Sequence, residues 1–378
     1  MNVIFTCGGT GGHINPAIAV ANMWKARYPD SKILFIGAVG GMEEKLVPKA
    51  GYELKTLPGG GLSRSLSFAG IKKNVKVMYN LMSSVSRCKK IIRDFKADIV
   101  VGTGGYASFP ALMAAGMLKI PSCVHESNAV PGLTTRMAER WASKILICFP
   151  QSARYYKDQS KVQIVGMPVH SQFLHGSKQA SREELGLENN RPVILSAFGS
   201  LGAKAMNEMT AELLRLEKEA GYPFQHIHAV GKFGWEWLPA LVKEKGVDTE
   251  NGSVFLKEYI YNMPTVMTAA DIVIGRAGSS SLNEIAAAGI PCILIPSPNV
   301  TANHQEKNAR ALEEQGAAVV MLESECTAQG VMDQINRLLN DSDAYSRMRS
   351  ALLGMAVPDS AERMCTIMED LISGNTKK

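Results

Sequence analysis

Four glycines and a histidine follow a short apolar run at the start of the chain. The sequence Val3-Ile-Phe-Thr continues into Cys7-Gly-Gly-Thr-Gly-Gly-His13. A glycine-rich turn between a strand and a helix exposes several backbone N–H groups, which can bind a phosphate or a developing negative charge. His13 lies at the edge of this turn, where a proton acceptor is useful. The spacing is not the dinucleotide fingerprint G-x-G-x-x-G, and an ordinary first turn of an α/β sheet is the alternative.

A second polar cluster follows another apolar run in the first half of the chain. His125-Glu126-Ser127-Asn128 comes directly after Cys123-Val124. Polar groups at the carboxyl end of a strand, next to a glycine-rich turn, are typical of binding and catalytic loops. A loop stabilised by its own hydrogen bonds is the structural alternative.

Three features of the second half suit a nucleotide. Gly199-Ser200-Leu201-Gly202 can offer N–H groups and a hydroxyl to a diphosphate, and Gly278-Ser279-Ser280-Ser281 opens a helix whose N-terminus is a second anion site. Glu284 can accept hydrogen bonds from both hydroxyls of a ribose, or it is a helix-start acid favoured by the helix dipole. His304-Gln305 can bind sugar hydroxyls or cap the next helix.

These residues need a scaffold that brings them together. Short apolar runs alternate with helical patterns along the chain, which predicts parallel sheets covered by helices. Ligands of such sheets bind beyond the carboxyl ends of the strands. The predicted strands are residues 2–6, 32–36, 98–102, 120–125, 144–148 and 161–165, and then 192–197, 225–230, 253–257, 271–275, 291–296 and 317–321.

The two halves of the chain repeat one another. Asp98-Ile-Val-Val-Gly102 recurs 173 residues later as Asp271-Ile-Val-Ile-Gly275, and each copy leads into a turn of small residues and a helix that ends in Ala-Ala-Gly. We therefore predict two similar α/β domains, residues 1–165 and 166–357. A last helix, residues 358–373, has no strand after it and is predicted to pack back on the first domain.

Length, composition and cysteine usage narrow the class of protein. The chain has 378 residues, of which 46% are hydrophobic and 20% are charged, which suits a globular protein of two domains. Its seven cysteines are scattered and include no C-x-x-C pair, so a disulfide framework and a zinc site are both disfavoured, and a reducing cytosol fits best. No signal peptide is expected, and no apolar run approaches the roughly 18–20 residues of a membrane span.

One stretch of the chain is strongly basic. The net charge is +6, and no Asp or Glu occurs from Leu54 to Arg93. Apolar residues recur at helical spacing there, beside Lys72 and Lys76. Such a helix packs on a core with its basic face in water, or it lies on an anionic leaflet, and the absence of carboxylates favours the membrane. Nucleic acid is disfavoured because no aromatic stacking platform accompanies the charge. The apolar residues are Phe68, Ile71, Val75, Met78, Tyr79, Met82 and Val85.

Taken together, these motifs resemble the MurG family of bacterial N-acetylglucosaminyltransferases. They occur in the family's order and span nearly the whole chain. The resemblance implies the GT-B fold class, in which two Rossmann-like α/β domains with parallel sheets face each other across a cleft. The motifs are Gly8-Gly-Thr-Gly-Gly-His13-x-x-Pro16-Ala17, Gly102-Thr-Gly-Gly-Tyr106-x-Ser108-x-Pro110, His125-Glu126-x-Asn128 and Arg276-x-Gly278…Glu284-Ile-Ala-Ala-Ala-Gly289-x-Pro291.

The resemblance also implies a reaction. GlcNAc moves from UDP-GlcNAc to the C4 hydroxyl of MurNAc in lipid I (undecaprenyl-diphospho-MurNAc-pentapeptide), with inversion, giving lipid II for peptidoglycan synthesis, cell shape and cell division. The first domain binds lipid I at the cytoplasmic face of the cell membrane, and the second domain binds UDP-GlcNAc. No cofactor and no metal are expected, because the nearest Asp-x-Asp, Asp341-Ser-Asp343, lies in a late helical linker. Backbone N–H groups near Ser200 and Ser279 would stabilise the leaving UDP.

Individual roles follow from the same resemblance. His13 is the candidate base for the acceptor hydroxyl, with Glu126 as the rival. The acceptor diphosphate is assigned to Gly9, Gly104, Gly105 and Tyr106, and the membrane contact to Phe68, Ile71, Lys72, Val75, Lys76 and Tyr79. The UDP-GlcNAc contacts are Thr10, Gly11, Gly12, His13, Asn128, His170, Ser200, Ile260, Ser279, Ser280, Ser281, Leu282, Asn283, Glu284, His304 and Gln305.

The sequence departs from the family pattern at three places. His170 replaces an arginine that approaches the nucleotide phosphates, Phe198 replaces a glycine before Gly199-Ser200, and Ser127 replaces a glutamine. Two other functions stay open: a different GT-B enzyme that uses UDP-GlcNAc, such as a 2-epimerase or a glycolipid synthase, and a nucleotide-sugar-binding protein without catalysis.

Overall fold

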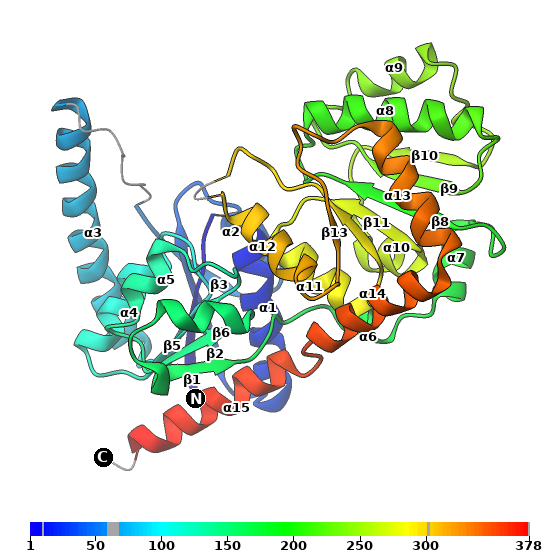
Figure 1. Cartoon of the computed structure of the whole chain (residues 1–378). Coiled ribbons are helices and arrows are strands. Elements are labelled where there is room, and N and C mark those ends of the chain that lie inside the picture. The colour runs from blue at the N-terminus through cyan, green and yellow to red at the C-terminus, as the bar shows by residue number, and fades with distance from the viewer. Residues whose placement is uncertain (10, 59–67, 301–302, 377–378) are drawn as a thin grey trace. The chain divides into compact units, whose positions relative to one another are not determined.

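The chain forms two compact units (Figure 1). Unit 1 comprises Met1–Val169 and Asp359–Lys378, and unit 2 comprises His170–Pro358. The structure is a computed structural model that describes residues 1–9, 11–58, 68–300 and 303–376, without the side chains of residues 68–79, 171 and 375–376.

Unit 1 is built on a seven-stranded parallel sheet in the order β3-β2-β1-β4-β5-β6-β7. Its strands are β1 (Asn2–Thr6), β2 (Lys32–Ala38), β3 (Glu53–Leu57), β4 (Ile99–Gly102), β5 (Ser122–Glu126), β6 (Lys144–Ile147) and β7 (Val162–Ile164). Its helices are α1 (Gly11–Arg27), α2 (Glu43–Lys49), α3 (Phe68–Phe95), α4 (Ser108–Met117), α5 (Leu133–Ala138) and α15 (Ser360–Thr376), with the 3₁₀ turns η1 (Pro150–Tyr155) and η2 (Gln159–Lys161).

Unit 2 is built on a six-stranded parallel sheet in the order β10-β9-β8-β11-β12-β13. Its strands are β8 (Val193–Ala197), β9 (Gln225–Ala229), β10 (Val254–Lys257), β11 (Ile272–Gly275), β12 (Cys292–Leu294) and β13 (Val319–Val320). Its helices are α6 (Ser171–His175), α7 (Lys178–Leu185), α8 (Lys204–Glu219), α9 (Leu238–Glu244), α10 (Met263–Ala269), α11 (Ser279–Ala288), α12 (His304–Glu313), α13 (Ala328–Asn340) and α14 (Ser342–Met355).

The two sheets share one topology, which confirms the predicted α/β fold class. Counted within each unit, both follow the strand order 3-2-1-4-5-6, and unit 1 adds a seventh strand. The order reverses between β1 and β4 in unit 1 and between β8 and β11 in unit 2. Ligands of open parallel sheets bind at such switch points, beyond the carboxyl ends of the strands.

All twelve predicted strands are present, and the prediction missed β3. This strand lies at the edge of the sheet, and its outward positions Glu53 and Lys55 are exposed while Leu57 is buried. In this short strand polar and apolar residues alternate, whereas the strands covered on both faces were predicted from continuous apolar runs.

The repeated aspartates have the same role in both units. The backbone N–H of Asn2 donates to Asp98 Oδ2 at 2.7 Å, and the N–H of Val193 donates to Asp271 Oδ2 at 2.6 Å. Each aspartate returns a backbone hydrogen bond, at 2.8 Å to the Asn2 carbonyl and at 2.7 Å to the Val193 carbonyl. The repeat therefore preserves a bond that fixes β4 to β1, and β11 to β8, on the side of the switch point remote from the glycine-rich turns.

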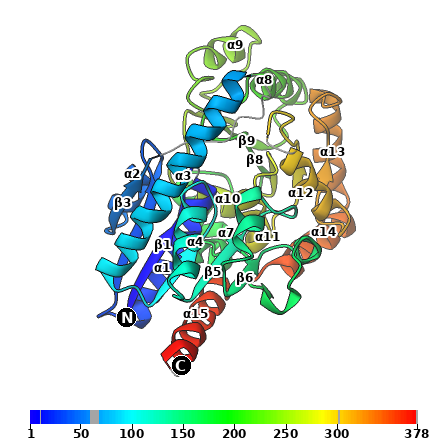
Figure 2. The same ribbon diagram turned by 90° about the vertical axis from the view of Figure 1, so that its left-hand side faces the viewer.

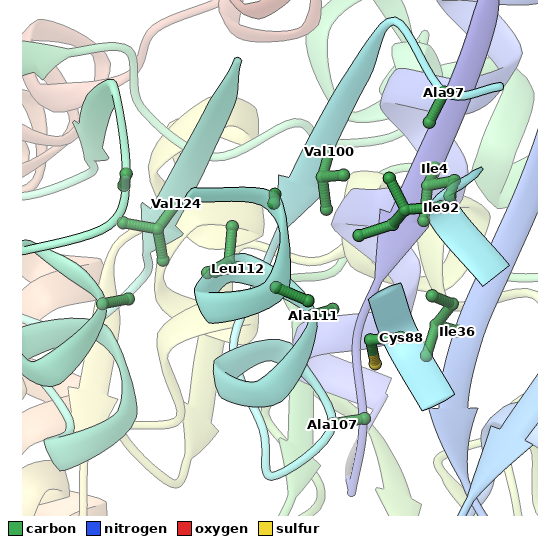
Figure 3. Packing of buried hydrophobic residues seen from close by; sticks show 14 of the residues in the cluster. Ile4, Ile36, Cys88, Ile92, Ala97, Val100, Ala107, Ala111, Leu112 and Val124 are labelled. Atoms are coloured by element: carbon green, nitrogen blue, oxygen red, sulfur yellow. The ribbon is translucent and has the colours of Figure 1, made fainter. Parts of the chain in front are cut away.

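Apolar clusters cover both faces of the sheet in unit 1. On one face, the buried strand residues Ile4, Val100 and Val124 pack with Ile92 of α3 and Leu112 of α4 (Figure 3). The cluster on the other face joins α1 to the C-terminal helix α15, which contributes Met364, Cys365 and Met368, all fully buried. The last helix of the chain therefore completes the core of unit 1, and Arg27 of α1 adds ion pairs to Glu362 and Glu369.

Helix α3 contains the basic, apolar stretch. Its C-terminal half packs beside α4, and Val85, Cys88 and Ile92 are buried in the core, while Met82 is 51% exposed. At Val85 the apolar stripe therefore faces the core. The N-terminal turns of α3 run past the end of α4 (Figures 1 and 2). The side chains assigned to membrane contact, from Phe68 to Tyr79, lie outside the described residues. Within the described parts of the chain, the structure contains no helix with the length and apolar character needed to cross a membrane.

Candidate active site

Two glycine-rich turns meet at the switch point of unit 1. One follows β1 and the other follows β4, and these strands are neighbours. Gly105 has φ +84°, and a Cβ atom at this position would lie only 2.1 Å from the carbonyl oxygen of Gly8. Both the positive φ and the close approach require glycine at position 105.

His13 is fixed between these turns by two hydrogen bonds to one residue. Its Nδ1 lies 2.9 Å from the carbonyl oxygen of Thr103, and Thr103 Oγ1 donates to the carbonyl of His13 at 2.6 Å. A carbonyl only accepts, so Nδ1 carries a proton and the neutral ring has its lone pair on Nε2. The imidazole lies against Gly104, where a Cβ would come within 2.6 Å of Nδ1.

The first turn has a buried carboxylate behind it that the sequence analysis missed. Glu43 begins α2 and is fully buried. Its Oε1 accepts the N–H of Ala38 at 2.7 Å, and its Oε2 accepts the N–H of Gly9 at 3.4 Å. The N–H of Gly9 is therefore directed into the protein. The signal was the glycine-rich stretch Gly37-Ala-Val-Gly-Gly-Met-Glu43, which leaves room for the carboxylate, since a Cβ at Gly37 would lie 2.4 Å from Glu43 Cγ.

Glu126 accepts hydrogen bonds from the loop that follows it. It is 2% exposed, and Oε1 accepts the backbone N–H of Asn128 at 2.8 Å and its side-chain Nδ2 at 3.0 Å. Oε2 accepts the N–H of Gly132 at 2.8 Å and the hydroxyl of Thr135. Four donors therefore occupy both carboxylate oxygens and fix the loop between β5 and α5. This arrangement matches the structural alternative considered for this cluster.

The neighbouring His125 is buried and contacts the segment of unit 1 that leads into unit 2. Its Nε2 donates to the carbonyl of Gly166 at 2.9 Å, and Cys148 Sγ lies 3.3 Å from the same nitrogen. Burial lowers the pKa of His125, so the ring is neutral at neutral pH. Tyr106, in the second glycine-rich turn, has a buried hydroxyl with no hydrogen-bond partner among the described residues, and burial raises its pKa.

In unit 2 the turn after β8 is fixed by the turn after β9. The N–H groups of Lys232 and Phe233 donate to the carbonyls of Ser200 and Leu201 at 3.3 and 3.1 Å. Gly199 and Gly202 have φ +98° and +79°, and the Gly202 N–H donates to the carbonyl of Gly199 at 3.0 Å. The turn therefore presents Ser200, which is exposed, from a fixed backbone.

Helix α11 starts at the switch point of unit 2 and carries an unpaired carboxylate. The helix begins at Ser279 after Gly278, and its first N–H groups have no partner within the helix. Glu284 lies one turn further on, is partly buried, and has no hydrogen-bond or ion-pair partner among the described residues. Desolvation raises the pKa of Glu284 to about 7. A carboxylate of this kind is ready to accept hydrogen bonds from a pair of hydroxyls.

The remaining nucleotide contacts assigned from the sequence follow other strands of unit 2 or begin its helices. Gln305 Oε1 accepts the N–H of Ser297 at 2.9 Å, in the segment after β12, and so bonds the protein backbone in this structure. Ile260 is buried after β10, and His304 begins α12. His170 caps α6, where its Nδ1 accepts the N–H of Gln172 at 3.3 Å.

Arg276 is a residue of unit 2 whose role the sequence analysis left unassigned. It donates to the Ile295 carbonyl at 2.9 Å, pairs with Glu323 at 2.5 Å, and places its guanidinium 5.9 Å from the ring centre of Phe198. Phe198 replaces a glycine of the family pattern, and its contact with Arg276 joins the end of β8 to the end of β11.

Comparison with known proteins covers nearly the whole chain. The glycosyltransferase family 28 N-terminal domain matches residues 3–147, and the family 28 C-terminal domain matches residues 193–364. The chain belongs to glycosyltransferase family 28. A relative from Acetivibrio thermocellus, named UDP-N-acetylglucosamine--N-acetylmuramyl-(pentapeptide) pyrophosphoryl-undecaprenol N-acetylglucosamine transferase, is 38% identical over 98% of both chains. A relative from Bacillus cytotoxicus with the same name is 36% identical over 98% of this chain and all of its own.

Solved structures agree with the family 28 assignment. MurG from Acinetobacter baumannii has a TM-score of 0.75 and 25% identity and covers 98% of this chain and 99% of its own. The UDP-GlcNAc 2-epimerase from Neisseria meningitidis, solved with UDP-GlcNAc, has a TM-score of 0.67 at 15% identity over 98% of this chain and all of its own. At that identity the epimerase shows only that the fold is shared. The predicted resemblance to the MurG family and the GT-B fold class are confirmed.

The predicted site residues fall into two groups, one in each unit. In unit 1, the turns with Gly9, Gly11, Gly12, Gly104 and Gly105 join His13 at the carboxyl edge of the sheet, and the loop with Asn128 follows the next strand, β5. In unit 2, Ser200 and the segment from Ser279 to Glu284, with Leu282 buried and Asn283 donating to the Ser279 carbonyl, follow the neighbouring strands β8 and β11. Thr10 lies outside the described residues.

Glu284 generates a prediction about stability and pH. Its folded-state pKa of about 7 lies above the ordinary value of 4.5, so its contribution to stability is present below pH 4.5 and is lost as the pH rises through 7. Glu284→Gln resembles the protonated form, so we expect the variant to be about 1–3 kcal/mol more stable than the wild type at pH 8 and nearly equal at pH 4.5. Urea unfolding at the two pH values measures the difference.

A matched control uses an exposed glutamate of unit 2. Glu208 of α8 is 52% exposed in its side chain, and its nearest cation, Lys204, is 3.8 Å away. Glu208→Gln should leave the free energy of unfolding unchanged at both pH values. Equal effects of the two substitutions, or a loss of stability in Glu284→Gln at pH 8, would contradict the prediction.

Proposed function

We propose that this chain is an inverting N-acetylglucosaminyltransferase that moves GlcNAc from UDP-GlcNAc to the C4 hydroxyl of MurNAc in lipid I, giving lipid II for peptidoglycan synthesis. The observation that carries this proposal is the full-length match, at 36–38% identity, to relatives named for a transfer of N-acetylglucosamine to N-acetylmuramyl-(pentapeptide) pyrophosphoryl-undecaprenol. The paired glycine-rich turns support it, since both substrates of such a transfer carry a diphosphate.

His13 is the proposed base for the acceptor hydroxyl. The hydrogen bond from Nδ1 to the Thr103 carbonyl leaves the lone pair of the neutral ring on Nε2, and this is the form a general base needs. Glu126, the rival candidate, accepts four hydrogen bonds from its own loop, which favours a role in positioning Asn128. We therefore assign proton abstraction to His13 and loop geometry to Glu126.

Unit 2 is the proposed donor site. Backbone N–H groups and the hydroxyl of Ser200, with the N-terminus of α11, would bind the diphosphate and stabilise the charge that develops on the leaving UDP. The unpaired carboxylate of Glu284 would accept both ribose hydroxyls. Ile260 is proposed to contact the uracil and Gln305 the sugar. His170 stands where the family has an arginine, and because its Nδ1 accepts from Gln172, its Nε2–H is the group that would donate to a phosphate oxygen.

Unit 1 is the proposed acceptor site. The turn with Gly104, Gly105 and Tyr106 lies beside His13, so a diphosphate bound there would put the acceptor sugar near the base. Gly9 belongs to the same surface, but its N–H donates to Glu43, so we propose that its other backbone atoms contact the ligand. The buried hydroxyl of Tyr106 has no partner among the described residues, so we propose that it donates to an oxygen of the bound diphosphate.

The experiment that tests the proposed reaction measures UDP release. The wild-type protein should release UDP only when both UDP-GlcNAc and a lipid I analogue are present. Release that is unaffected by omitting the acceptor would contradict the transfer. Conversion of UDP-GlcNAc to UDP-ManNAc without acceptor would identify an epimerase instead.

The role of His13 yields a prediction for turnover. His13→Ala should lower kcat about 10²–10⁴-fold, because the acceptor hydroxyl loses its base. The Kd for UDP-GlcNAc, measured by calorimetry, should change less than about threefold, since its main contacts are assigned to unit 2. Asn15→Ala, an exposed change on the same helix, is the control and should leave both constants unchanged. Wild-type turnover in His13→Ala would contradict the assignment of the base to His13.

Helix α3 is the proposed contact with the anionic inner leaflet at the cytoplasmic face of the cell membrane. Its sequence combines an apolar stripe with lysines and has no carboxylate before Asp94, and the C-terminal turns of the helix are fixed to the core by Val85, Cys88 and Ile92. A helix fixed at one end can present its other end to a lipid surface. This placement would bring the enzyme to a membrane-bound acceptor.

Vesicle sedimentation tests this contact. The wild-type protein should bind phosphatidylglycerol vesicles, weakly bind phosphatidylcholine vesicles, and lose binding as salt is raised. The double variant Lys72→Glu, Lys76→Glu should bind phosphatidylglycerol at least tenfold more weakly, since each surface lysine contributes about 1 kcal/mol. Lys204→Glu, Lys243→Glu in unit 2 makes the same charge change at exposed sites and should have little effect. Equal losses in both variants would contradict the assignment to α3.

A further inference from the structure

Five buried polar side chains form a continuous hydrogen-bonded chain in the core of unit 2. Glu217 and Asn207 come from α8, Ser196 from β8, and His226 and His228 from β9, and none is more than 1% exposed. We call them the buried chain. In order, its contacts are Glu217 Oε1 to His226 Nδ1 at 2.7 Å, His226 Nε2 to Ser196 Oγ at 2.7 Å, Ser196 Oγ to His228 Nδ1 at 2.7 Å, His228 Nε2 to Asn207 Oδ1 at 3.1 Å, and Asn207 Nδ2 to the Val230 carbonyl at 2.9 Å.

The Val230 carbonyl sets the direction of these hydrogen bonds. A carbonyl only accepts, so the NH₂ group of Asn207 must face it and the Oδ1 of Asn207 must face His228. His228 therefore carries its proton on Nε2. Burial, with a smaller effect of His226, lowers the pKa of His228 to about 3, so the ring is neutral and holds no second proton. Its Nδ1 is then an acceptor.

Ser196 lies between the two histidines and contacts both. A hydroxyl has one proton, and here His228 Nδ1 must receive it. The contact between Ser196 Oγ and His226 Nε2 can then be a hydrogen bond only if His226 donates. A further proton lies in the bond between Glu217 and His226 Nδ1. In a catalytic serine–histidine–acid triad the serine donates to the histidine, so the direction here is the opposite.

We propose that His226 is protonated on Nε2 in the folded protein, so that the Glu217–His226 pair holds two protons and the buried chain donates in one direction from His226 to the carbonyl of Val230. Every donor between His226 and Val230 then has an acceptor. A chain that lacked this proton would leave two acceptors facing each other in the core, which is costly where no water is present.

The end of the chain fixes the turn that supports the proposed diphosphate site. Val230 begins the turn after β9, and a Cβ at Gly231 would lie 2.1 Å from the Gly202 nitrogen. The same turn donates the N–H groups of Lys232 and Phe233 to the Ser200 turn. Asn207 is thus a positioning residue for Ser200. This step rests on the proposed function, whereas the direction of the chain does not.

Nuclear magnetic resonance of the ¹⁵N-histidine-labelled protein tests the direction of the chain. At pH 7.5 we expect His226 Nε2 and His228 Nε2 each to show a one-bond N–H coupling and slow exchange with solvent, and His228 Nδ1 to show none. The signals are assigned through their own backbone resonances in the wild-type protein, so no variant needs to fold. An unprotonated His226 Nε2 would overturn the proposal.

A substitution tests the positioning role. Asn207→Leu keeps a similar volume but can neither donate to the Val230 carbonyl nor accept from His228, whereas a buried Asp would be protonated and could still donate. Amide exchange at Lys232 and Phe233 should become at least tenfold faster, and the Kd for UDP should rise about tenfold. Leu213→Ala, which removes a fully buried side chain of the same helix outside the apolar cluster of Val230, is the control and should change neither, although it lowers stability.

The two readouts separate the possible failures. Unchanged amide exchange in Asn207→Leu, or equal changes in Leu213→Ala, would overturn the positioning role. Failure of the wild-type protein to bind UDP would instead contradict the proposed function and leave the exchange result to decide the role of Asn207.

Discussion

Two hydrogen bonds join His13 to Thr103 across the switch point of unit 1, and the proposed chemistry depends on them. They fix both the position and the tautomer of the imidazole, since the Thr103 carbonyl accepts from Nδ1. This contact exists because β1 and β4 are neighbours and because Gly104 leaves space for the ring. A side chain there would occupy the position of His13. The second glycine-rich turn therefore supports the base as well as offering N–H groups to a ligand.

Unit 2 uses the same topology for a different purpose. Its switch point also brings two turns together, but the groups that gather there are Ser200, the N-terminus of α11 and the carboxylate of Glu284. Desolvation of an unpaired carboxylate is unfavourable for the folded protein, which is typical of a group retained for ligand binding. The buried chain ends on the Val230 carbonyl, in the turn that is hydrogen-bonded to the Ser200 turn. The polar interior of unit 2 is thereby connected to its proposed binding surface.

Much of this architecture could be predicted from the sequence. The continuous apolar runs predicted twelve of the strands. The repeated Asp98 and Asp271 segments predicted two similar domains, because a repeated segment forms the same contacts with neighbouring strands in each copy. The edge strand β3 was missed because it is short and polar on one side. Val85 was grouped with an apolar stripe assigned to the membrane, but tertiary packing places it in the core. Periodicity shows that a helix has an apolar face and does not show what covers it.

Contacts between distant residues were beyond the sequence analysis. Glu126 was a candidate base by residue type, yet its oxygens accept donors up to Thr135, and only the fold shows this. Glu43 and the buried chain were missed for the same reason: the glycines before Glu43 leave room for a side chain, but the sequence does not show which distant groups Glu43 or the buried histidines contact. The sequence predicted which turns would bind charge, and the structure added the polar groups that fix those turns.

The central claim is that Gly104 makes room for His13 to act as the base, and a pair of glycine substitutions tests it most directly. Gly104 and Gly40 both have positive φ, +105° and +74°, but only Gly104 contacts His13, whereas a Cβ at Gly40 meets no atom within 4 Å. The kcat of Gly104→Ala should fall about 10²-fold while the kcat of Gly40→Ala stays within a few-fold of the wild type. Wild-type turnover in Gly104→Ala would contradict the account.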